Sequence, residues 1–252
     1  MSLEIESIRP KVEAAVRSFW AVRAGGNGVL GGKTLDAFAE IIKDVVKGSL
    51  ENAMMCGRGC VAEIPGFYRP HKSWDLIVID EGKLVAAIEF KSQIGPIGNN
   101  FNNRTEEVLG SSLDLQTAIE ENAFGLEANV FSGYIIVVED SPKSRANPKI
   151  KMKYFPVMEG FLANEDERGR AYFPNPDGSY PQAKGISYIE RYDLMCKRLM
   201  MKKLYTASAV ITSEPGAGLS GSYGHVSKET SIEAFLIKLA KHCEGIAEMK
   251  SL

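Results

Sequence analysis

Three ionisable side chains near the ends of two neighbouring segments are the best candidates for chemistry in this sequence. Asp75 opens the segment DLIVID, and Glu89 and Lys91 lie near the end of KLVAAIEFKSQ. Two carboxylates offer the hard oxygen ligands that Mg²⁺ takes in proteins. An ammonium group beside them would stabilise an activated water or hydroxide that attacks a phosphodiester. The acid-x-Lys spacing alone carries little weight, because the chain contains three such strings.

The two segments have the pattern of a β-hairpin, with strands over Trp74–Ile79 and Lys83–Lys91. Side chains alternate between the two faces of a strand, so Glu89 and Lys91 share one face. Whether Asp75 joins them depends on the length of the turn, because a slip of one residue moves every side chain to the other face.

The turn therefore decides whether a site can form. A turn of two residues would place Asp75 on the opposite face from Glu89. A turn of three residues, over 80–82, pairs Asp75 with Ala87 and places it on the same face as Glu89. We favour the longer turn, because Gly82 suits the left-handed position of a type I turn with a bulge, and because the other face is then apolar throughout.

In that geometry Asp75, Glu89 and the carbonyl of Phe90 would hold Mg²⁺, and Lys91 would act on the attacking water. The alternative is an ordinary surface hairpin in which Lys91 neutralises one acid. The residue set is that of the PD-(D/E)xK nucleases. Trp74 stands where that pattern has a proline, a tolerable departure because the proline supplies no ligand.

The remaining elements follow from hydrophobic periodicity. They predict an α/β fold with a mixed β-sheet flanked by helices; the likeness to the PD-(D/E)xK nucleases implies that this is a restriction-endonuclease-like core. We expect one domain over 1–252, with a catalytic core at about 59–139. We expect helices to about residue 24, over 35–50, from Asn103 to about 119, over 188–204 and from about 230, and further strands over 130–138 and 207–212.

The composition excludes several classes of protein. The formal net charge of −2, from 30 basic and 32 acidic residues, excludes a strongly basic, histone-like DNA binder. No apolar run approaches the ~20 residues of a membrane span. The four cysteines lack the spacing of a zinc ribbon, so we expect reduced thiols and a cytoplasmic protein. The glycine-rich segments 31–34 and 216–221 match phosphate-binding loops poorly, because the strand and helix that such loops need are missing or misplaced.

Several longer strings carry a resemblance to a known family. They are PGFYRP at 65–70, WDL at 74–76, AAIEFKSQ with a following GP, and NNFNNRTEE with following LGS and LDL. Together they resemble the XhoI/PaeR7I family of type II restriction endonucleases. The resemblance is densest from Pro65 to Ala118 and extends more loosely over the whole chain. It favours the nuclease over the ordinary surface hairpin.

The resemblance implies a homodimer that cleaves double-stranded DNA with Mg²⁺ and leaves 5′-phosphate ends. It implies the palindrome CTCGAG, cut after its first C to leave 5′ overhangs, and a separately encoded methyltransferase for the same site. Carried over by position, Asp75, Glu89 and Lys91 take the metal-binding and catalytic roles. The PD-(D/E)xK superfamily often adds an acid from a helix, for which Glu40 and Glu51 are both candidates.

A polar segment after Lys91 has the chemistry of DNA reading. Amide side chains can bond adenine bidentately, and arginine can bond guanine. A polar loop whose side chains serve its own turns is the alternative. Residues 142–154 also contain five basic residues and no acid, which suits phosphate contacts or a solvated loop. The candidate DNA-reading residues are Gln93, Asn99, Asn100, Asn102, Asn103 and Arg104.

Three other functions stay open from the sequence. A structure-directed or damage-directed nuclease would use the same core. A DNA-binding protein without catalysis, or a nucleotide-binding protein that uses a glycine loop, belongs to a different class. Cleavage of plasmid DNA into bands of fixed size, lost in Asp75→Ala and Lys91→Ala variants, separates the site-specific nuclease from all three.

Overall fold

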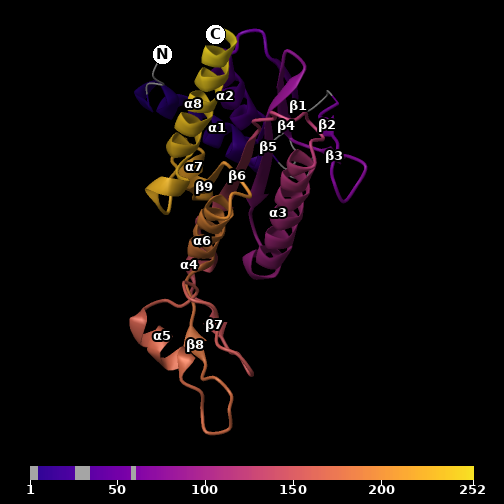
Figure 1. The fold of residues 1–252 in the computed structure, drawn as a ribbon. Coiled ribbons are helices and arrows are strands. Elements are labelled where there is room, and N and C mark those ends of the chain that lie inside the picture. Colours follow the sequence, from indigo (N-terminus) through magenta and orange to yellow (C-terminus); the bar gives the residue numbers. More distant parts are fainter. Residues whose placement is uncertain (1–4, 26–34, 58–60) are drawn as a thin grey trace.

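The computed structural model describes residues 5–25, 35–57 and 61–252. At its centre is a sheet with the order β1-β4-β5-β6-β9 (Figure 1). The first three strands of that order are antiparallel, and the last three are parallel. The predicted α/β fold with a mixed, helix-flanked sheet is therefore confirmed. The strands are β1 (Met54–Gly57), β4 (Leu76–Asp80), β5 (Lys83–Gln93), β6 (Phe131–Glu139) and β9 (Ala207–Ser213).

Helices cover both faces of this sheet, as Figure 1 shows. One face packs against α1 (Ile5–Ala24), α2 (Asp36–Lys47) and α8 (Ile232–Lys250) in one hydrophobic cluster. The other packs against α3 (Ile97–Glu120) and α6 (Tyr188–Met201) in a second cluster. The central strand β6 is consequently buried along almost its whole length, as parallel strands with two covered faces are.

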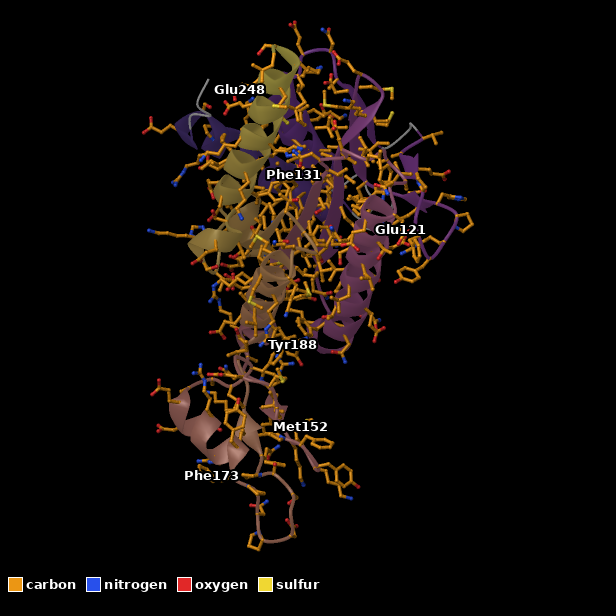
Figure 2. All side chains as sticks on the ribbon, viewed as in Figure 1. Glu121, Phe131, Met152, Phe173, Tyr188 and Glu248 are labelled. Atoms are coloured by element: carbon orange, nitrogen blue, oxygen red, sulfur yellow. The ribbon has the colours of Figure 1, made fainter. Side chains whose placement is uncertain are left out.

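A small lobe extends from the body beyond the end of β6 (Figure 1). It contains a two-stranded sheet and a helix around a small apolar cluster of Leu162, Ala171 and Ala183. Figure 2 shows Tyr188 at the junction with the body, and Met152 and Phe173 on the lobe. The lobe accounts for much of the segment 139–188, whose sequence has no clear periodicity. Its elements are β7 (Lys149–Ile150), α5 (Glu165–Tyr172) and β8 (Ala183–Lys184).

Short elements connect the larger ones. A second small sheet, β2 (Glu63–Ile64) with β3 (Lys72–Ser73), lies just before β4 in the chain. The others are α4 (Pro142–Arg145), α7 (Pro215–Gly218) and the 3-10 turn η2 (Lys228–Thr230).

The predicted turn of the β4–β5 hairpin is wrong. The turn has two residues, Glu81 and Gly82, both with positive φ, which is the geometry of a tight hairpin turn. A bulge follows, because Val78 pairs with Ala86 whereas Ile79 pairs with Leu84. The extra residue shifts the register, so the strands continue in a pairing that sets Asp75 opposite Glu89 rather than Ala87.

The start of α3 also differs from the prediction. The helix begins at Ile97, six residues before the expected start at Asn103. Ile97 and Phe101 are buried, and the Phe101 ring lies 5.1 Å from that of Tyr192 on α6. Packing against α6 therefore draws the asparagine-rich segment into the helix, although its side chains favour turns.

Three further predictions concern the glycine-rich segments, the cysteines and membrane spans. Gly218, of the glycine-rich segment 216–221, packs directly under Trp20, where a Cβ atom would collide with the indole ring. This glycine therefore serves packing. The other glycine-rich segment, residues 31–34, lies outside the described residues. Cys196 and Cys243 are free and buried as expected. Cys56 is disulfide-bonded, contrary to expectation, and Cys60 lies outside the described residues. No helix among the described residues is long and apolar enough to cross a membrane.

Candidate active site

The candidate site lies where β5 extends beyond the end of its neighbour β4. The ladder between the two strands ends at Leu76 and Ile88, so the next part of β5 has no β4 partner on that side. Asp75 immediately precedes β4 and fills part of this gap. Its Oδ2 accepts a hydrogen bond of 2.8 Å from the backbone N–H of Phe90. The carbonyl of a strand residue faces the same neighbour as its N–H, so the Phe90 carbonyl points toward Asp75.

Asp75 and Glu89 converge on one ammonium group. The Lys91 Nζ lies 2.7 Å from Glu89 Oε1 and 3.7 Å from Asp75 Oδ2. The two carboxylates therefore lie on the same side of the hairpin, although the turn that produces this arrangement is not the one expected. The Asp75 side chain is 45% exposed and that of Glu89 only 6%, so the site has an open side and a buried side.

Glu89 is ionised despite its burial. Burial alone would raise the pKa of its carboxyl group, but the positive charges of Lys91 and Lys72 outweigh this effect and lower the pKa below its usual value. The O–H of Tyr205 lies 3.3 Å from Glu89 Oε2 and donates to it. Burial and the negative charge of Glu89 raise the pKa of Tyr205 well above its usual value, so this hydroxyl keeps its proton.

Lys72 belongs to the same charge cluster, and sequence reasoning missed it. Its Nζ lies 3.5 Å from Glu89 Oε1 and 4.1 Å from the centre of the Trp74 ring. The strand β3 that carries it is too short to show periodicity. A signal did exist: Lys72 and Trp74 are two residues apart, and in an extended segment such residues share a face.

The donor set fits a divalent metal ion of the Mg²⁺ type. Asp75, Glu89 and the Phe90 carbonyl offer oxygen atoms only, and Mg²⁺ commonly takes one or two carboxylates and keeps several waters. The exposed side of Asp75 leaves room for those waters. Among the described residues, no group of three or more His, Cys, Asp or Glu side chains could hold a metal ion, so a metal here would depend on two carboxylates.

Neither candidate helix acid joins the site. Glu40 is exposed on α2 and pairs with Lys43 at 2.7 Å, and Glu51 is exposed just after this helix. Helix α2 packs on one face of the sheet. Glu89 contacts Tyr205, which belongs to the cluster on the other face. The structure therefore places Glu40 on the face of the sheet opposite Tyr205, and the addition of a helix acid to the site stays a prediction.

Known restriction enzymes share sequence with most of this chain. Residues 19–173 and 170–225 match the family described as restriction endonuclease XhoI. The type II restriction enzyme XhoI of Xanthomonas vasicola is 37% identical over 218 residues, which cover 80% of this chain and 79% of that protein. The type II restriction enzyme BstVI of Geobacillus stearothermophilus is 32% identical over 222 residues, 85% of this chain and 88% of that protein.

The chain belongs to the XhoI restriction endonuclease family. A third relative, the type II restriction enzyme AbrI of Azospirillum brasilense, is 39% identical over 205 residues, 71% of this chain and 92% of that protein. No solved structure matches the chain significantly. Membership makes this protein an enzyme of a restriction system, an endonuclease that binds DNA and hydrolyses it at specific sites. Enzymes of this type generally use divalent metal ions.

The string PGFYRP, which carries part of the resemblance to the XhoI family, forms a loop clamped by a buried acid. The Asp114 side chain, from the LDL string on α3, is 3% exposed. It accepts bonds from Arg69 Nε at 2.7 Å and from the backbone N–H of Tyr68 at 2.8 Å. Gly66 packs so closely on this carboxylate that a Cβ atom would collide with it. The two strings are therefore parts of one structural unit, beside the β2–β3 sheet that carries Lys72.

The candidate DNA-reading residues of this XhoI-family chain lie on α3 rather than on a loop. Asn102 and Asn103 are exposed on its first turns, and Asn100 is half-buried. Asn99 lies on the same turns, but its side chain is outside the description. Arg104 forms a short ion pair with Glu107, one turn further on. The exposed amides of Asn102 and Asn103 remain available to a ligand.

Gln93 does not join them. It is 1% exposed, and its amide oxygen accepts a bond from Tyr192 at 3.3 Å. Its amide nitrogen lies 3.4 Å from the Pro96 carbonyl. The side chain is enclosed between the end of β5 and α6, so it cannot reach a base in this structure. The structure therefore separates Gln93 from the other candidates, because the last residue of β5 lies under the covering helices, and its role in reading DNA stays a prediction.

Proposed function

We propose that this protein is a homodimeric, Mg²⁺-dependent type II restriction endonuclease whose active site contains Asp75, Glu89 and Lys91. The observation that carries the proposal is the convergence of both carboxylates on the Lys91 ammonium group at the open edge of β5. We take residues 1–252 as one restriction-endonuclease domain, with a catalytic core at about 59–139. We place the enzyme in the cytoplasm, where it meets its DNA substrate.

In this mechanism Asp75, Glu89 and the Phe90 carbonyl would hold the cation. When bound, the cation offsets the negative charge that develops on the phosphate in the transition state. Lys91 loses its contact with Asp75 most easily, since that contact is 3.7 Å long. Its ammonium group then orients the attacking water and stabilises the negative charge that develops around the attacking oxygen in the transition state. Tyr205 fixes the second oxygen of Glu89 from the buried side.

We propose that α3 presents its first turns to the bases. Asn102 and Asn103 are exposed there, and an asparagine amide matches the donor and acceptor of adenine in the major groove. Arg104 would have to leave Glu107 to reach a guanine. The family resemblance implies the palindrome CTCGAG, with cleavage after the first C and 5′ overhangs. A two-fold symmetric site suits a two-fold symmetric dimer, and a separate methyltransferase would protect the same sequence in the host.

Mapping of the cut ends tests the sequence assignment. Unmethylated plasmid DNA incubated with the enzyme and Mg²⁺ is expected to give fragments of fixed size, each with a four-base 5′ overhang TCGA and a 5′-phosphate. A matched plasmid with one base pair of each CTCGAG changed is the control, and we expect it to stay intact. Fixed fragments that end at another sequence would reject the assignment, and a smear or junction-dependent cutting would reject site specificity.

The small lobe offers a second contact with the duplex. Lys149, Lys151 and Lys153 are exposed there, and the neighbouring aromatic rings of Tyr154 and Phe155 are 70% and 74% exposed. Basic side chains on an extended segment suit the phosphate backbone, which positions a protein on DNA without reading its sequence. Arg145, on the same basic run, instead pairs with Asp140 through two nitrogens.

The salt dependence of DNA binding tests this contact. In a variant with Lys149, Lys151 and Lys153 all changed to alanine, we expect the slope of log affinity against log salt to fall by roughly 2–3, about one per lost phosphate contact. The preference for the recognition sequence is expected to persist, because phosphate contacts carry no direct sequence information. An unchanged slope in a folded variant would mean that the lobe stays away from the DNA.

A further inference from the structure

Lys72 is a cation of the active site to which the mechanism above gives no role. Its side chain is only 12% exposed and contacts Glu89 at 3.5 Å. The Trp74 ring lies beneath its ammonium group, 4.1 Å away, and such a contact attracts a cation. The tryptophan that replaces the proline of the PD-(D/E)xK pattern therefore forms a platform for a second lysine.

The charges of the site balance only while no metal is bound. Asp75 and Glu89 face Lys72 and Lys91, two negative charges against two positive ones. A divalent cation on the two carboxylates would add two positive charges and compete with the ammonium groups for Glu89 Oε1. The contact with Lys72 is the longer of the two at that oxygen, 3.5 Å against 2.7 Å for Lys91. It is therefore the easier to displace.

We propose that Lys72 leaves Glu89 when the metal binds and then contacts a phosphate group of the DNA at the cleavage site. This inference rests on the proposed function. The displaced ammonium group lies beside a site with surplus positive charge, and a backbone phosphate is the anion that the substrate brings there. The Trp74 ring keeps the ammonium group in place while it exchanges one anion for the other. Lys72 is then a substrate-binding residue, distinct from Lys91.

DNA binding with Mg²⁺ tests the contact in a Lys91→Ala background, in which we expect cleavage to be slow enough for binding to be measured. Adding Lys72→Met is expected to weaken specific binding about 3–10-fold and to lower the slope of log affinity against log salt by about one. Lys72→Arg retains the charge and can stack on tryptophan, so we expect it to keep the slope. Lys83→Met, at the far end of β5, is the matched control and should change neither quantity.

Metal binding without DNA provides a second readout. In the otherwise unchanged protein, Lys72→Met removes a cation that competes for Glu89, so calorimetric Mg²⁺ affinity is expected to rise about tenfold, as for charges about 5 Å apart in a water-like dielectric. A residue that merely supports the fold would instead lower the melting temperature and leave the salt slope unchanged. Equal salt slopes with and without Lys72→Met, or unchanged Mg²⁺ affinity, would overturn the proposal.

A second substitution at the same position tests the proposal if Lys72→Met does not fold. Lys72→Gln keeps a polar contact with Glu89 but removes the charge, and it carries the same expected losses of affinity and slope.

These experiments also distinguish a failure of this inference from a failure of the proposed active site. If Lys91→Ala itself cuts DNA at the parent rate, the active-site assignment fails. If Lys91→Ala is inactive and Lys72→Met has no effect on slope or metal affinity, only the role of Lys72 fails.

Discussion

Replacing Glu89 with glutamine is expected to reduce DNA cleavage by about three orders of magnitude, the scale on which loss of transition-state charge stabilisation acts. Glutamine has nearly the same shape, so it retains the contact with Tyr205, but it removes the charge that attracts two lysines and that we propose as a metal ligand. Cleavage of supercoiled plasmid with Mg²⁺ measures the rate. Calorimetric titration with Mg²⁺ is expected to show that metal binding is lost in the same variant.

Glu81 provides a matched control for this substitution. It occupies the same position in another acid-x-Lys string, at the turn of the same hairpin, and its side chain is 70% exposed. Its ion pair with Lys250 at 3.0 Å lies on the surface, where such pairs contribute little to stability. Glu81→Gln is expected to cut at the parent rate. A folded Glu89→Gln enzyme that cuts as fast as the Glu81→Gln control would remove Glu89 from the active site.

Replacing Lys91 with alanine is expected to reduce cleavage by roughly two to three orders of magnitude while specific DNA binding persists. The ammonium group contacts both carboxylates, and in the proposed mechanism it acts on the attacking water. Without it, the negative charge on the attacking oxygen loses its nearest partner. Gel-shift or fluorescence-anisotropy titration with Mg²⁺ measures binding, and single-turnover cleavage measures the chemical step.

Lys83→Ala is the corresponding control, because Lys83 is an exposed lysine in the string that also contains Glu81. We expect this variant to match the parent in both assays. Two results would contradict the role of Lys91: a cleavage rate within a few-fold of the control, or a loss of specific binding as large as the loss of cleavage. The second would make Lys91 a binding residue rather than a group that acts on the attacking water.

The sequence by itself predicted which side chains would carry the chemistry and that Glu89 and Lys91 lie on one strand. Period-two alternation places Glu89 and Lys91 on one face, and the apolar pattern identifies the hairpin that holds them. The same local patterns located β6, β9 and the large helices other than the start of α3 within a few residues. These features depend on neighbours in the chain, so a single sequence contains the information. The prediction of site-specific cleavage came from longer sequence strings that resemble the XhoI family, not from the composition.

Only the tertiary structure decided how Asp75 reaches Glu89. A two-residue turn alone would place Asp75 and Glu89 on opposite faces of the hairpin. The bulge opposite Val78 and Ile79 shifts the register and returns both residues to one face. No local pattern predicts the bulge, because it depends on how both faces of β5 pack against helices from distant parts of the chain. The early start of α3 has a similar cause, since Phe101 packs against Tyr192.

Which other residues lie around Asp75, Glu89 and Lys91 also depended on the fold. Lys72 comes to Glu89 from a strand of two residues, and Gln93 is removed from the surface by the helix that covers the end of β5. Glu40 belongs to a helix on the opposite face of the sheet. Side-chain alternation is a local property of a strand, whereas which helix covers which face is settled by the burial of apolar surface across the whole chain.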